Sequence, residues 1–126
     1  MALATNYGLT KIPVYVMQST AGYFGWMALD GGVTVEAAGT TALTTEITTN
    51  GGGRAAATRA YEADYKATFY KLFTFTGDLS IYGVGIADSA SASSATIGIV
   101  HKYASVRNVA NLETCAITQK VVFAAV

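Results

Sequence analysis

Residues that usually carry catalysis or bind metals are scarce in this chain, which has one histidine, His101, and one cysteine, Cys115. Two such ligands are too few to close a structural zinc site, and a lone cysteine forms no internal disulfide. General acid–base and nucleophilic catalysis need a titratable group supported by partners. His101 falls instead on an alternating stretch that predicts a half-buried strand residue. The sequence therefore predicts no enzyme, no metal site and no cofactor.

For the other candidate sites, a purely structural role of the residues is favoured over a functional one. A Cys115–His101 pair requires neighbouring strands, and Cys115 lies on an apolar strand face where a buried, inert thiol is expected. The stretch NGGGR at residues 50–54 precedes a strand, so it lacks the helix N-terminus of a phosphate loop. Asp30 precedes two glycines without the spaced acidic residues of a calcium loop, which favours a turn.

Charged residues are also scarce in this sequence. Charged residues make up 13% of the chain, and eight basic residues balance eight acidic ones. They are scattered, so no basic patch for nucleic acid or anionic lipid is visible. No apolar run is long enough to span a membrane, and residues 1–10 lack the pattern of a secretory signal, so we expect folding in the cytoplasm. So neutral a surface is typical of a protein that sits against other protein.

What the chain does have is period-two alternation. Its 126 residues fit a single domain, residues 1–126. In residues 61–75 the odd positions are mostly aromatic or small and apolar, whereas the even positions are mostly polar, which favours strands over a helix. Seven strands are predicted, at residues 12–17, 23–29, 54–61, 65–76, 79–87, 96–105 and 113–124.

These strands, with no convincing amphipathic helix, predict an all-β fold: an antiparallel β-sandwich of immunoglobulin-like or jelly-roll topology. Pro13 confines the first strand to a sheet edge or to an extended N-terminal arm, residues 1–17. Residues 30–53 form a long Thr/Gly-rich loop without a period, and we expect it to contact a neighbouring subunit. Residues 88–95 are predicted to be an exposed loop.

Four segments together resemble small structural proteins of tailed-bacteriophage virions, some capsid-associated and others similar to tail fibres. They are MALDGG at 27–32, TALTTEITTNGGGRAAAT at 41–58, FTFTG at 73–77 and SIYGVGIA at 80–87. The most specific is the second, which sets Glu46 and Arg54 at a fixed separation, and we expect these two to form an ion pair across the loop. Family members usually carry an acidic residue just before the Val-Gly of the last segment, where this chain has Gly83.

The resemblance implies a structural role on a virion, whose shell surface would be the place of the protein after its synthesis in the host cytoplasm. A domain of this size without a shaft favours a capsid decoration (cement) subunit that binds the major capsid protein and copies of itself, as a trimer or another homo-oligomer. The alternatives are a tail or neck appendage that binds a receptor or glycan, and a self-assembling filament subunit. Aromatic and apolar residues near the N-terminus are the predicted interface: Tyr7, Ile12, Tyr15, Tyr23, Phe24 and Trp26.

Overall fold

The computed structural model describes residues 3–5, 24–62, 66–92 and 96–122. Across this part of the chain the regular elements are all strands, and it holds no helix that could span a membrane. The strands are β1 (Leu3–Ala4), β2 (Trp26–Asp30), β3 (Ala55–Ala56), β4 (Thr58–Glu62), β5 (Lys66–Thr74), β6 (Leu79–Ala87), β7 (Ile97–Val109) and β8 (Thr114–Val122).

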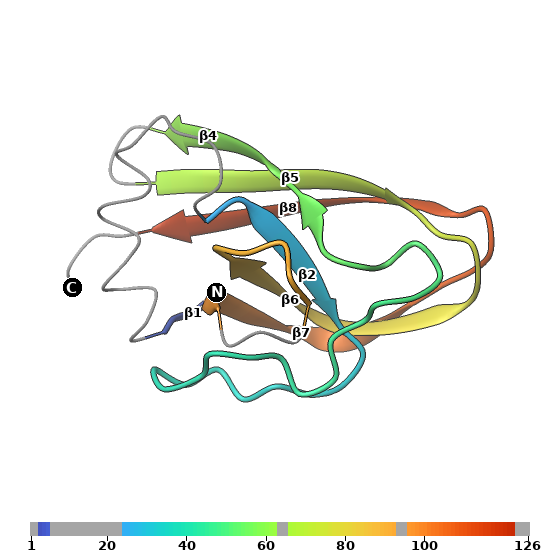
Figure 1. Cartoon of the computed structure of the whole chain (residues 1–126), viewed down its shortest axis with the longest axis horizontal. Coiled ribbons are helices and arrows are strands. Elements are labelled where there is room, and N and C mark those ends of the chain that lie inside the picture. The colour runs from blue at the N-terminus through green and yellow to red at the C-terminus, as the bar shows by residue number, and fades with distance from the viewer. Residues whose placement is uncertain (1–2, 6–23, 63–65, 93–95, 123–126) are drawn as a thin grey trace.

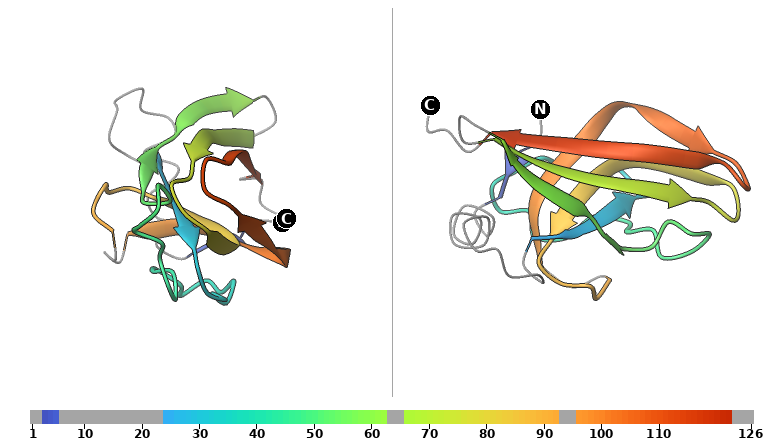
Figure 2. Two further views of the ribbon diagram at one scale, coloured as in Figure 1. Left: turned by 90° about the vertical axis from the view of Figure 1, so that its right-hand side faces the viewer. Right: turned by 90° about the horizontal axis from the view of Figure 1, so that it is seen from above.

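The strands form two antiparallel sheets that pack face to face as a sandwich, as the sequence predicted (Figures 1 and 2). One sheet has the order β1-β7-β6-β2-β3, and the other has the order β4-β5-β8. The sequence pattern leaves this order open, because alternation shows which face of a strand is apolar but not which strands are neighbours.

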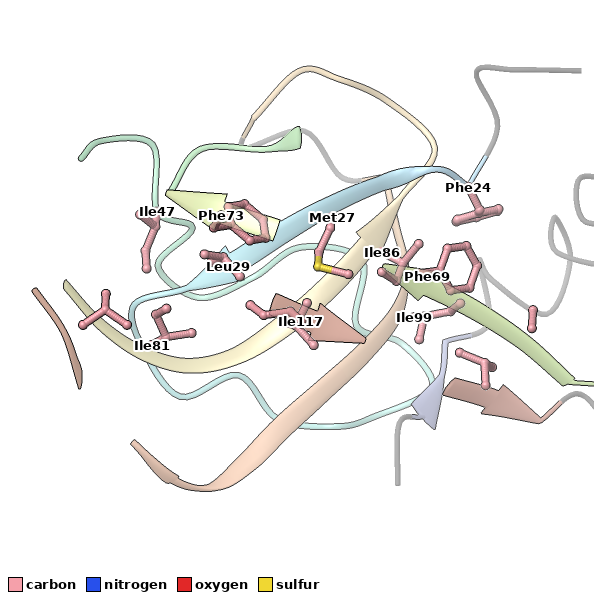
Figure 3. Close-up of a cluster of buried hydrophobic side chains, with 14 of the residues drawn as sticks. Phe24, Met27, Leu29, Ile47, Phe69, Phe73, Ile81, Ile86, Ile99 and Ile117 are labelled. Carbon is pink, nitrogen blue, oxygen red and sulfur yellow. The ribbon is translucent and has the colours of Figure 1, made fainter. Parts of the chain in front are cut away.

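The main core lies between the two sheets and consists of the inward residues of both (Figure 3). Met27, Leu29 and Ile86 come from the larger sheet, while Phe69 and Phe73 come from β5, and all five are almost fully buried. The alternation that identified residues 65–76 as a strand therefore arises from contact with this core. Phe73 and Phe75 stack with ring centroids 6.1 Å apart.

The larger sheet is also buried on its outer face. A second cluster lies there, built from Ala28, Ala87, Ile97 and Val100 with Leu43 from the long loop. Two-sided burial explains why residues 97–100 are an apolar run without alternation. The 30–53 loop, predicted to reach a neighbouring subunit, therefore packs through Leu43 on its own domain.

Three predicted strands correspond closely to β5, β6 and β8, and β6 has the predicted bounds. The predicted strand at 54–61 is wrong as a single element. Its first part, β3, pairs with β2, while β4 pairs with β5 in the opposite sheet. The chain crosses between the sheets at Ala57, whose N–H donates to the carbonyl of Gly25 at 2.7 Å. Small alanine side chains at 55–57 give no signal that could locate this crossing.

β7 continues four residues beyond its predicted end and contains a large bulge. Ile81 of β6 pairs with Arg107 and Gly83 pairs with Lys102, so residues 103–106 lie opposite Tyr82 alone. Residues 104–108 are exposed, so no alternation remains to reveal the strand. A bulge of this kind bends a strand away from its partner.

The N-terminal prediction is only partly within the described residues. β1 lies at the edge of the larger sheet beside β7, and Thr5 is buried with its hydroxyl donating to the carbonyls of Ile97 and Gly98. Residues 3–5 thus belong to the domain itself and not to a detached arm. The strand predicted at 12–17 lies outside the described residues.

Candidate functional site

Glu46 and Arg54 form the predicted ion pair. The guanidinium donates from Nε to Glu46 Oε2 at 2.7 Å and from Nη2 to Oε1 at 2.9 Å, which is the two-bond geometry of a strong charge-assisted contact. Both side chains are almost fully buried, at 1% and 3% exposed. Arg54 Nη1 also donates to the carbonyl of Ser89 and to the hydroxyl of Thr96. One buried guanidinium thus joins the long loop to both ends of the β6–β7 connection.

Asp30 fixes the other end of the long loop. Its buried carboxylate accepts hydrogen bonds from the N–H of Gly32 at 3.1 Å and of Thr45 at 3.2 Å, and from the Thr34 hydroxyl. Asp30 also forms a β-bridge with Glu46. Residues 30–46 therefore form a closed loop held by two buried acidic side chains. The sequence suggested only a turn at Asp30. The hydrogen bonds to its carboxylate could not be predicted, because the donors come from residues up to 15 positions away.

The anchored loop presents two apolar side chains to solvent. Val33 and Val35 are 52% and 72% exposed. With Glu36 they line one side of a groove of about 550 Å³, whose other side is residues 101–104 of β7. Glu36 holds the loop against β7, because its Oε1 accepts the N–H of Lys102 and lies 3.5 Å from His101 Nδ1. His101 is half-buried, as predicted.

A second cleft lies between the bulge of β7 and β8. It has a volume of about 410 Å³ and is lined by residues 103–107 and 115–118 together with Ile81. Burial raises the pKa of the Tyr103 phenol, the nearby Cys115 raises it further, and Arg107 partly opposes them. The cleft is an opening at the side of the sandwich, where β7 and β8 are not paired with one another.

The predicted catalytic alternative and part of the predicted interface are not supported by this geometry. His101 and Cys115 lie on β7 and β8, which belong to different sheets, so the required neighbouring strands are absent. Phe24 is 1% exposed and is a core residue, so its place in the predicted interface is wrong. Trp26 is half-buried against the second cluster. The other predicted interface residues lie outside the described part of the chain: Tyr7, Ile12, Tyr15 and Tyr23.

Gly83 lies where the backbone leaves no room for a side chain. A Cβ atom at this position would collide with the carbonyl oxygen of His101, because β6 and β7 approach closely beside the bulge. An acidic side chain therefore does not fit here without separating the two strands. In the described ranges no group of three or more His, Cys, Asp or Glu side chains is arranged to hold a metal ion.

Comparisons with known proteins give no relative: no family model, no curated protein and no solved structure matches this chain.

Proposed function

We propose that this protein is a structural component of a tailed-phage virion, a decoration subunit that binds the assembled capsid shell. The observation that carries the proposal is that the four segments of the resemblance form one connected unit. The first, at 27–32, pairs with the last along β2 and β6. The second meets the first at the Asp30–Glu46 bridge, and Asn50 accepts the N–H of Thr76 from the third.

This unit holds the candidate contact surface in a fixed shape. The long loop is anchored by Asp30 and by the Glu46–Arg54 pair, so little conformational entropy remains to be lost when it binds. Val33 and Val35 are the apolar residues that it offers to a partner. Burying a valine side chain contributes roughly 1.5–3 kcal/mol. A protein that binds only the assembled shell stabilises that shell by mass action.

The location is tested by immunogold electron microscopy. Antibodies raised against the purified chain are applied to particles of the tailed phage that encodes it. We expect regular labelling over the shell. Labelling restricted to tails, or an absence of label on the particles, would overturn the decoration role.

The contact surface is tested by co-sedimentation of the purified chain with shells that lack it. The double variant Val33→Asp/Val35→Asp should stay in the supernatant, because a shell contact would have to desolvate two carboxylates. Leu112→Asp is the control, since Leu112 is an apolar residue of the β7–β8 turn that is at least as exposed as the two valines. Equal sedimentation of both variants would exclude the loop as the contact.

A further inference from the structure

One edge of β8 has no partner strand within the described part of the chain, which is unusual for a monomeric protein. β8 pairs with β5 along one side, and no described residue pairs with the other side. The strand has nine residues, contains neither proline nor glycine, and carries a single charge, Lys120. Natural proteins usually protect such edges with several charges, proline, bulges or short length. The opposite edge, β4, is only five residues long and includes Arg59 and Glu62.

We propose that β8 pairs antiparallel with β8 of a second copy of this chain, about a twofold axis at Thr118. This register is the one in which all nine residues of each strand find a partner. Cys115 then faces Val121, Ile117 faces Gln119, and Thr118 faces its own counterpart. The single charge, Lys120, faces Ala116, so no like charges lie directly opposite one another. The two small sheets become one continuous sheet of six strands.

The cleft beside β8 is consistent with this partner. The twofold axis is perpendicular to the sheet, so the core-facing sides of the two small sheets point in the same direction. The cleft of each copy, which lies next to β8, is therefore beside the other copy. Val106, which is 42% exposed on the bulge of β7, borders this cleft. Pairing at β8 thus places an exposed apolar side chain and an opening in the sandwich next to the second subunit. The dimer does not depend on the proposed virion role.

Disulfide trapping tests the register directly. In a Cys115→Ala background, Thr118→Cys places two thiols opposite one another, with Cβ atoms about 4.5–5.5 Å apart, close enough for a disulfide after small adjustments. Thr114→Cys in the same background is the matched control, because Thr114 is exposed on the same face of the same strand. In the proposed register, residue 114 of the second copy would lie eight residues along the strand from residue 114 of the first, roughly 26 Å away. We expect a covalent dimer only with Thr118→Cys; no dimer, or equal amounts from both variants, would overturn the proposal.

Sedimentation equilibrium supplies the second test. The wild-type chain should form a closed dimer, whereas a monomer would overturn the proposal, and so would an open filament, which indicates pairing of β8 with β4. Ala116→Lys sets a lysine opposite Lys120 in both halves of the interface, and we expect it to weaken the dimer roughly 2- to 30-fold. Ala116→Glu at the same exposed position should not weaken it. Equal effects of the two variants would exclude this register.

Discussion

Arg54 binds the carboxylate of Glu46 through two hydrogen bonds inside the protein, with almost no exposure of either side chain to solvent. The pair brings together residues eight positions apart and closes the loop between β2 and β3, two neighbouring strands of the larger sheet. Its burial makes it a structural contact whose loss affects the whole domain.

Removing one partner of this pair should destabilise the fold strongly. Glu46→Gln leaves the Arg54 guanidinium buried without its counter-charge, which costs about 3–5 kcal/mol of unfolding free energy. Arg107→Met is the control, because the exposed Arg107–Glu113 contact of 3.9 Å contributes about 1 kcal/mol at most. Urea unfolding measures both variants, and a loss below about 1 kcal/mol for Glu46→Gln would show that the pair is not a main support of the fold.

The Asp30 carboxylate should control the order of the long loop. Asp30→Ala removes the acceptor of three hydrogen bonds, and we expect faster hydrogen exchange at residues 31–45 and a loss of about 2–3 kcal/mol in stability. Asp78→Ala provides the comparison, since Asp78 accepts one exposed hydrogen bond from Asn111. Unchanged exchange in the Asp30 variant would show that Leu43 and Ile47 suffice to hold the loop.

The close approach of β6 to β7 at Gly83 should tolerate no side chain. Gly83→Ala must push the two strands apart beside the bulge, and we expect a loss of about 1–3 kcal/mol. Gly39→Ala is the matched control, because a Cβ atom there meets nothing within 4 Å. Thermal unfolding measures the stability of both variants. Equal stability of the two would mean that the strands separate at little cost in free energy.

The raised pKa of Tyr103 predicts a stability change at alkaline pH. Because the folded state holds the phenolic proton more tightly than the unfolded chain, the neutral phenol favours folding. Its contribution is complete below the ordinary tyrosine pKa, near 10, and is lost as pH rises through the raised value. The free energy of unfolding should therefore fall more steeply above pH 10 in the wild type than in Tyr103→Phe, as measured by urea unfolding across that range. Parallel curves would contradict the prediction.

Much of the fold could be predicted because alternation is a local consequence of one-sided burial. β5 and β8 each have one face on the core, so their inward residues repeat every second position along the sequence. β6 is buried over most of its length on both faces, so its apolar residues form a more continuous run. The same logic failed at residues 54–61, where small alanines carry the chain from one sheet to the other, and at residues 103–106, where the bulge removes the alternation. It also assigned Phe24 to an interface, because an aromatic residue in a core and one in an interface look alike in a sequence.

The sequence by itself determined the all-β fold class, the scarcity of catalytic groups and the pairing of Glu46 with Arg54, since each depends on residue type and short spacing. Only the tertiary structure decided which strands are neighbours, that residues 30–53 cover their own sheet, and that β8 has an edge to which no described residue pairs. These features depend on contacts between distant segments, such as Leu43 with Ile97 or Arg54 with Thr96. Such contacts follow from how the two sheets are arranged in space, and no local pattern in the chain records that arrangement.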